Sequence, residues 1–389
     1  MMKGSFPVES FRKMETPFYY YDTQLLAKTL QTIKEEAARH EGFVVHYAVK
    51  ANANPKVLRL VASYGMGADC VSGGEIKAAL EAGFPAKGIV YAGVGKKDWE
   101  INLGLEKGIL CFNVESLAEL EVINDLAGKA GKVADICLRV NPDVRAHTHK
   151  NITTGLAENK FGIALCDLFP AMEEAQKMPN IHFIGIHFHI GSQILDMFDF
   201  VALCNRINDI QSQLRQRNIK VRIINVGGGL GVDYTDPEAN PIPDFKNYFQ
   251  TYSRHLHLWG EQQVHFELGR AVVAQMGSLI TQTLYVKRGV NKKFVIVDAG
   301  MSDLIRPALY QAYHKIENIS SEKPLATYDV VGPICESSDV FGKHIDLNET
   351  QRGDLIAIRS AGAYGEIMAS QYNCRPLPKG YLTEDLQQA

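Results

Sequence analysis

Short apolar runs alternate with longer stretches of helical periodicity over the first two thirds of the chain, and this alternation constrains the fold more than any other feature. Runs rich in Val, Ile and Phe predict strands, and the stretches between them predict helices. Repeating strand–helix units predict a parallel sheet, and eight units within about 250 residues predict a (β/α)8, TIM-like barrel. The predicted strands are 43–50, 67–70, 88–92, 109–113, 134–140, 181–189, 221–227 and 263–267.

The pattern changes near residue 275, beyond which short strands are separated by turns rather than by helices. We therefore expect an α/β chain with a barrel domain over 23–272, and a β-rich domain over 1–22 and 273–389 that completes the active site. Strands of the second domain are predicted at 18–21, 294–298, 328–331 and 354–359. Helices are predicted at 22–40, 54–65, 73–83, 97–107, 116–130, 164–178, 197–217 and 243–259.

Composition excludes several classes of function. The 389 residues suffice for one barrel and a smaller domain, and a net charge of -3 gives no electrostatic reason to expect nucleic acid or membrane as a partner. The polar N-terminal residues and the short apolar runs predict that the chain is neither secreted nor membrane-spanning. Seven cysteines without a CxxC pair argue against a disulfide framework or a zinc site, so we expect a cytoplasmic protein without a metal.

Residues that a hydrophobic core does not need stand at the ends of the predicted strands. The active sites of such barrels lie at the carboxyl ends of the strands, so these side chains are expected to converge on one pocket. Asn113 and Asn141 are equally well explained as helix caps or turn formers. The strand-end residues are Lys50, Asp69, Asn113, Arg139, Asn141, His189, Gly227–Gly229 and Glu267.

Lys50 points to Schiff-base chemistry. A lysine at the end of an apolar strand needs a partner or a chemical role, and desolvation makes its amine a usable nucleophile. That chemistry suits aldolases as well as enzymes that use pyridoxal 5'-phosphate (PLP). The glycines 227–229 follow the seventh strand, where barrels often bind phosphate, and Glu267 ends the eighth, where a carboxylate could keep a pyridine nitrogen protonated. Together these features favour PLP.

Two further residue types could bind a ligand. His187 and His189 form an HxH pair, but no third ligand has suitable spacing, so stacking of His189 on a cofactor ring is the better interpretation. Arg270 can bind a phosphate or a carboxylate, although a surface salt bridge is the commoner use of an arginine.

Several segments resemble the fold-type III PLP decarboxylases, over almost the whole chain and in the family's order. The resemblance implies an alanine racemase-like barrel, PLP as cofactor and decarboxylation of an amino acid. One position departs from the family, because Leu268 stands where proline is usual, which makes that turn less rigid. The matching segments are Tyr47–Asn52, Ser72–Glu75, His187–Gln193, Gly227–Gly229 and Glu267–Arg270.

Within the family, the chain is most similar to the members that convert meso-2,6-diaminopimelate to L-lysine and CO2, the last step of lysine biosynthesis. Three segments carry this closer resemblance: Thr154–Gly162, Arg306–Tyr310 and Cys335–Asp339.

The resemblance also implies residue roles. Lys50 would hold PLP, His189 would stack on its ring, and Cys335 would donate a proton from across a homodimer interface. The implied cofactor-binding set is Lys50, Asp69, His189, Ser192, Gly227, Gly228, Gly229, Glu267, Leu268, Gly269, Arg270 and Tyr364. The implied substrate-binding set is Arg270, Arg306, Tyr310, Glu336 and Tyr364.

The residue types support this substrate independently. Two arginines can bind the carboxylate at the far end of diaminopimelate while Glu336 binds its ammonium group, and a substrate such as ornithine would not need the arginines. Alternatives are a decarboxylase of ornithine, arginine or carboxynorspermidine, and a non-catalytic relative without cofactor. Cys335 could also be a small buried hydrophobe, the usual role of a free cysteine.

Overall fold

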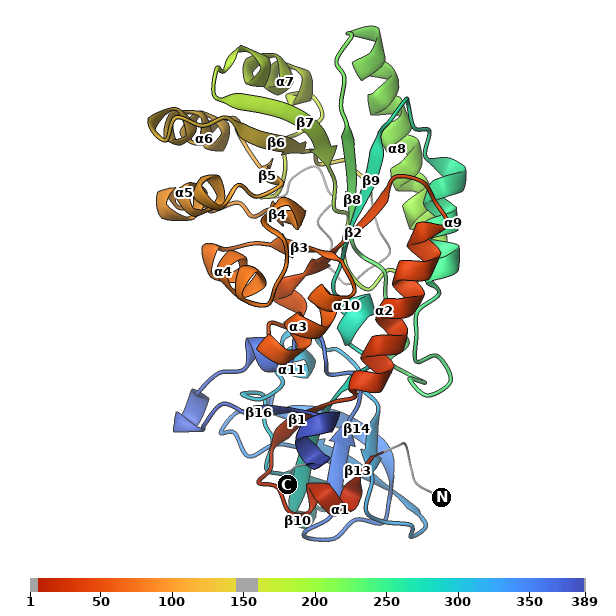
Figure 1. Cartoon of the computed structure of the whole chain (residues 1–389). Coiled ribbons are helices and arrows are strands. Elements are labelled where there is room, and N and C mark those ends of the chain that lie inside the picture. Colours follow the sequence, from red (N-terminus) through yellow and green to blue (C-terminus); the bar gives the residue numbers. More distant parts are fainter. Residues whose placement is uncertain (1–5, 145–159, 388–389) are drawn as a thin grey trace. The chain divides into compact units, whose positions relative to one another are not determined.

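The structure is a computed structural model that describes residues 6–144 and 160–387. The chain divides into two compact units, neither of which is one continuous segment (Figure 1). The barrel unit consists of Leu30–Gly231 and Asp244–Gly269. The β-rich unit consists of Met1–Thr29, Val232–Pro243 and Arg270–Ala389. Residues 232–243, which the sequence analysis placed in the barrel domain, therefore belong to the β-rich unit.

Eight parallel strands close into a barrel in which each strand pairs with the next and the eighth pairs with the first. The predicted fold class is confirmed. Alternation along the strands sends His46 and His265 inward, where their ring nitrogens lie 2.9 Å apart. The barrel strands are β2 (Phe43–Ala48), β3 (Gly67–Cys70), β4 (Ile89–Tyr91), β5 (Cys111–Val114), β6 (Ala134–Arg139), β7 (Ile181–His187), β8 (Ile223–Gly227) and β9 (Gln263–Leu268).

Helices between the strands surround the barrel (Figure 1). Their starts follow the sequence, since the side chains of Asn54, Ser72 and Ser116 each accept a backbone N–H in the first turn of a helix. The helices are α2 (Thr23–Ala38), which begins in the β-rich unit, α3 (Pro55–Ser63), α4 (Gly73–Glu81), α5 (Asp98–Lys107), α6 (Leu117–Lys129), α7 (Leu168–Lys177), α8 (Met197–Gln216) and α9 (Phe245–His255).

The β-rich unit contains an eight-stranded sheet with the strand order β12-β15-β10-β11-β13-β14, in which β1 pairs with both β10 and β16. Short helices α1 (Val8–Phe11), α10 (Arg270–Val273) and α11 (Arg306–Tyr310) belong to this unit. The strands are β1 (Phe18–Tyr21), β10 (Gly277–Arg288), β11 (Lys293–Val297), β12 (Ile316–Asn318), β13 (Leu325–Val331), β14 (Val340–Asn348), β15 (Leu355–Ile358) and β16 (Lys379–Leu382).

The predicted end of the first barrel strand is wrong, and this changes the placement of Lys50. The first barrel strand ends at Ala48 rather than at Lys50, and Val49–Ala51 form a 3-10 turn. Lys50 is therefore carried by the turn that follows the strand.

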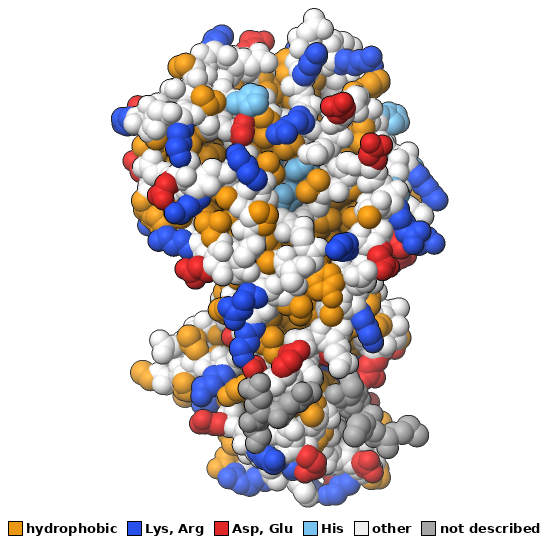
Figure 2. All heavy atoms as spheres, in the orientation of Figure 1, with side chains coloured by type: hydrophobic (Ala, Val, Ile, Leu, Met, Phe, Trp, Pro, Cys, Tyr) orange, Lys and Arg blue, Asp and Glu red, His pale blue; other side chains and the backbone are white. Residues whose placement is uncertain are grey.

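The surface carries charges of both signs. Lys and Arg side chains lie among Asp and Glu side chains on the face shown in Figure 2, in keeping with the small net charge. Within the described parts of the chain, none of the helices is both long enough and apolar enough to span a membrane.

Candidate active site

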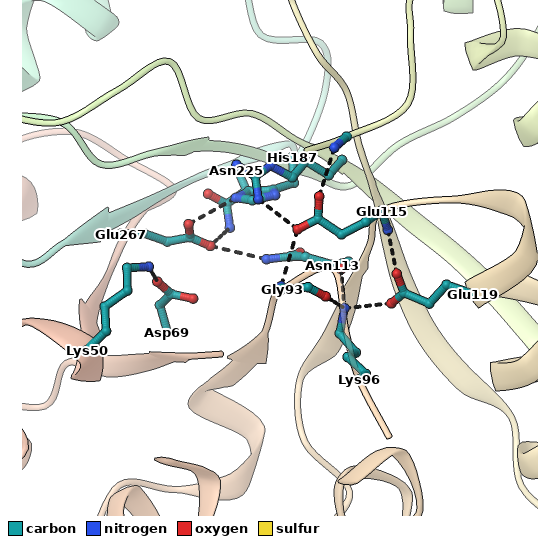
Figure 3. Close-up of polar contacts among 12 residues, drawn as sticks. Lys50, Asp69, Gly93, Lys96, Asn113, Glu115, Glu119, His187, Asn225 and Glu267 are labelled. Atoms are coloured by element: carbon teal, nitrogen blue, oxygen red, sulfur yellow. Dashed lines mark hydrogen bonds and ion pairs between the residues drawn. The ribbon is translucent and has the colours of Figure 1, made fainter. Parts of the chain in front are cut away.

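A buried carboxylate occupies the carboxyl end of the barrel interior (Figure 3). Oε1 of Glu267 accepts hydrogen bonds from Nδ2 of Asn225 at 2.7 Å and from Nδ2 of Asn113 at 3.2 Å, and Oε2 lies 2.9 Å from Nε2 of His187. Burial alone would raise the pKa of Glu267, but His187 and the nearby Lys50 outweigh it and hold the pKa below its usual range. The carboxylate is therefore ionised and fixed in orientation.

Lys50 lies beside a second buried carboxylate. Its Nζ is 2.8 Å from Oδ2 of Asp69, while Oδ1 of Asp69 is buried without a hydrogen-bond partner among the described residues. Burial and the negative charge of Glu267 raise the pKa of Asp69, and Lys50 opposes that rise. The structure thus brings the predicted lysine, Asp69 and Glu267 into one group.

His189 follows β7 in the same barrel and is neutral. Its Nδ1 accepts the N–H of Gly228 at 3.3 Å, so the ring proton is on Nε2. Burial, together with the positive charges of Arg139 and Lys50, lowers the pKa of His189 to about 3. A flat, uncharged ring at this place is suited to stacking on an aromatic ligand.

The glycine run after β8 has a structural reason as well as the predicted one. A Cβ on Gly228 would lie 2.0 Å from the carbonyl oxygen of Glu267, and Gly227 has a φ of +71°. The N–H of Gly227 donates to Oδ1 of Asn225, and that of Gly228 donates to His189. These two amides therefore orient side chains of the site, and their role in holding a phosphate stays a prediction.

A network of buried charges lies at the ends of β4, β5 and β6 (Figure 3). Nζ of Lys96 donates to the carbonyl oxygens of Gly93 and Asn113 and to Oε1 of Glu119, at 2.8, 2.9 and 2.6 Å. The predicted strand-end residue Arg139 donates to Oε1 of Glu115 at 2.7 Å. The network fixes the backbone of Asn113, whose side chain holds Glu267.

A second cluster of predicted residues lies in the β-rich unit. Arg270 and Arg306 are both buried, and they share one aromatic neighbour, Tyr234. Nη1 of Arg270 donates to the hydroxyl of Tyr234 at 2.7 Å, and the guanidinium carbon of Arg306 lies 4.9 Å from the centre of the Tyr234 ring. Tyr364 is a further predicted residue of this unit, and its ring centre lies 5.0 Å from the guanidinium carbon of Arg270.

Tyr364 has an unusual backbone. Its φ is +56°, a region that residues other than glycine rarely adopt. Such conformations recur at functional sites, but eight other non-glycine residues of the described chain share a positive φ, so the role of Tyr364 stays a prediction.

The remaining predicted residues of the β-rich unit are more exposed. Tyr310 ends α11 and is partly buried, whereas Cys335 and Glu336 are exposed. The N–H of Cys335 donates to Oδ1 of Asn373 at 3.4 Å, and Oε1 of Glu336 accepts the hydroxyl of Tyr372 at 2.6 Å. Asp339 of the same predicted segment accepts N–H groups on both carboxylate oxygens and so fixes the loop.

Ser192 follows β7, Leu268 is the last residue of β9, and Gly269 comes next. Leu268 is buried and pairs with Tyr47 in the barrel ladder. Most of the predicted segment Thr154–Gly162 lies outside the described residues, but Gly162 is described, and its N–H donates to Glu115.

Residues 24–274 match the family model described as the pyridoxal-dependent decarboxylase, pyridoxal binding domain. The chain belongs to the pyridoxal-dependent decarboxylases. It is 67% identical over 385 residues to the diaminopimelate decarboxylase of Bacteroides thetaiotaomicron, with 99% of this chain and 100% of that protein covered. This family membership makes the chain a PLP-dependent decarboxylase.

Solved structures agree with that assignment. The structure of diaminopimelate decarboxylase from Helicobacter pylori complexed with L-lysine is similar with a TM-score of 0.91 and 42% identity, covering 97% of this chain and 94% of that one. The lysine/ornithine decarboxylase from Vibrio vulnificus complexed with putrescine has a TM-score of 0.83, with 97% of each chain covered, but only 22% identity, so it shows the fold alone.

The barrel residues of this decarboxylase fit PLP. Oε2 of Glu267 retains a lone pair after its contact with His187, so it can accept the N–H of a protonated pyridine. Neutral His189 offers a face for the ring, and the Lys50 amine lies in the same barrel end. Oδ1 of Asp69, which has no hydrogen-bond partner among the residues that the structure describes, is a buried acceptor suited to a ligand that brings a donor.

Sequence reasoning did not single out four residues that contact the predicted ones. Lys96 and Asn225 do so in the barrel unit, and Tyr234 and His314, which contacts Arg306, do so in the β-rich unit. Asn225 had a usable signal, because it alternates with Gly227 and so shares the inward face of β8. Lys96 sits between glycines and another lysine, a pattern that resembles an exposed loop.

Proposed function

We propose that this chain catalyses the PLP-dependent decarboxylation of meso-2,6-diaminopimelate to L-lysine and CO2. The observation that carries the proposal is the environment of Arg306. This guanidinium is buried, and in the described part of the chain no carboxylate forms an ion pair with it. A buried charge without a counter-ion requires an anionic ligand, and the carboxylate at the far end of diaminopimelate supplies one.

The barrel residues would serve the cofactor. Bound PLP supplies an electron sink for the electron pair left when CO2 departs. Lys50 would hold the cofactor, Glu267 would keep its ring nitrogen protonated, and His189 would pack against the ring. Ser192, Gly229 and the amides of Gly269–Arg270 would bind its phosphate.

Residues of the β-rich unit would recognise the substrate. Arg270 and Arg306 would bind the distal carboxylate, with Tyr310 and Tyr364 beside them, and Glu336 would bind the distal ammonium group. Cys335 would deliver a proton from Sγ to the α-carbon once CO2 has left. We further propose that the enzyme is a cytoplasmic homodimer and that Cys335 serves the site of the partner subunit.

The test is CO2 release by the purified protein loaded with PLP. Meso-diaminopimelate should be decarboxylated at least 100-fold more efficiently than ornithine, arginine or carboxynorspermidine, because only its distal carboxylate can engage a pair of arginines. A higher kcat/KM for one of the other three substrates would overturn the proposal and identify the chain as a decarboxylase of that substrate.

A further inference from the structure

Arg306 is held by a histidine rather than by an acid. Its Nη1 lies 2.8 Å from Nε2 of His314, and its Nε is buried without a hydrogen-bond partner in the described chain. The histidine and the Tyr234 ring therefore fix the guanidinium without neutralising it. At least one of its N–H groups remains unused inside a buried site.

The hydrogen bonds determine the protonation state of His314. A guanidinium can only donate, so Nε2 of His314 must accept from Arg306. The carbonyl oxygen of Arg359 can only accept, and it lies 2.8 Å from Nδ1, so Nδ1 must carry the proton. Burial and the positive charge of Arg306 lower the pKa of His314 to about 3, in agreement with a neutral ring.

The position of His314 is set by the sheet. It stands just before β12, and β12 pairs with β15 so that Ile316 lies opposite Ile358. The carbonyl of Arg359, which follows β15, thus presents a fixed acceptor to the imidazole. The ring also packs edge-on against Tyr234, with centroids 5.2 Å apart and an interplanar angle of 80°.

We infer that His314 is a positioning residue that selects substrates with a distal carboxylate: as a neutral acceptor it aims the Arg306 guanidinium and leaves its positive charge for the substrate. The inference rests on the proposed function. A carboxylate at position 314 would hold Arg306 equally firmly but would neutralise it, and the site would lose its preference for an anion.

Two substitutions of nearly equal size separate these effects. In His314→Gln the amide oxygen can accept from Arg306 and the amide nitrogen can donate to Arg359, so the KM for meso-diaminopimelate should stay within about threefold of the wild type. In His314→Glu the new carboxylate captures Arg306, and the KM should rise about 10- to 100-fold, with a much smaller change in kcat.

Other measurements distinguish the positioning of Arg306 from a general loss of folding or cofactor binding. The absorbance spectrum of bound PLP should be similar in the two variants, whereas the melting temperature of His314→Glu should be the lower one, because a carboxylate cannot donate to the Arg359 carbonyl. The inhibition constant of pimelate, an unreactive dicarboxylate, should rise with His314→Glu and not with His314→Gln. The matched pair His257→Gln and His257→Glu, at an exposed histidine of the barrel unit, should leave the KM unchanged.

Equal KM and pimelate inhibition constants in the Gln and Glu variants would overturn the inference. The proposed function is judged separately, on the wild type: failure to release CO2 from meso-diaminopimelate would refute it whatever the variants do.

Discussion

At the scale of single residues, burial and neighbouring charges determine how the site is charged. Glu267 is ionised because His187 and Lys50 outweigh the effect of its burial, and two amide groups fix it without adding charge. His189 is neutral because burial near Arg139 and Lys50 disfavours a further positive charge. The site thus combines one fixed carboxylate with one uncharged ring.

Glu75 is a partly buried carboxylate to which we assign no catalytic role, and it gives a pH-dependent prediction. Burial raises the pKa of Glu75 to about 7, although the N–H of Val71 and the charge of Lys50 oppose the rise. Between pH 4.5 and 7 the unfolded chain has lost this proton while the folded chain keeps it. The contribution of Glu75 to stability is therefore present at low pH and lost as the pH rises through that window.

The substitution Glu75→Gln removes the free-energy cost of burying a charged carboxylate above pH 7. It keeps an oxygen that can accept the N–H of Val71. We expect its melting temperature to exceed that of the wild type by about 2–4 °C at pH 8, and the difference to vanish near pH 4.5. Calorimetric melting at both pH values measures it. A difference that stays constant with pH would show that Glu75 titrates normally.

At the scale of secondary-structure elements, Lys96 ties the ends of β4 and β5 together. Its side chain is 1% exposed and that of Glu119 is 11% exposed, so the pair is buried. Lys96→Met leaves the Glu119 carboxylate without its cation and should lower the free energy of unfolding of the barrel by about 3–5 kcal/mol.

The double variant Lys96→Met/Glu119→Gln should recover part of that loss, because it buries no unpaired charge. Lys129→Met is the matched control, since it breaks an exposed ion pair with Asp125 in α6 and should leave stability nearly unchanged. Urea unfolding of the four proteins gives the comparison. An equal loss in Lys96→Met and Lys129→Met would refute a special role for Lys96.

The elements also show what a sequence can and cannot reveal. All eight barrel strands were predicted, because apolar periodicity and strand-end polar residues are local signals. Strand β10 was missed although it is the longest in the described chain: β11 follows it directly, but β1 and β15, which pair with its first half, lie far away in the sequence. Tyr234 and His314 were missed for the same reason, since only the folded sheet brings them to Arg306.

At the scale of the whole molecule, the proposed homodimer predicts complementation between inactive variants. Lys50→Ala should lack cofactor attachment and Cys335→Ala should lack the proton donor. If each site uses Lys50 of one subunit and Cys335 of the other, a mixed dimer of the two variants has one intact site. Random re-association of equal amounts should then restore about a quarter of the wild-type activity.

The measurement is CO2 release after the two variants are unfolded together and refolded. The controls are each variant refolded alone, which should stay inactive. If the mixture is no more active than the controls, Lys50 and Cys335 do not come from different subunits.

Strand β1 has a consequence for the way the chain folds during synthesis. Phe18–Tyr21 are buried, and they lie between Gly277–Ile280 of β10 and Lys379–Leu382 of β16. The ribosome therefore releases four consecutive aromatic residues long before either of their neighbours exists. Until β10 and β16 have been synthesised, this segment exposes apolar side chains and unpaired backbone groups, which favour aggregation of the nascent chain.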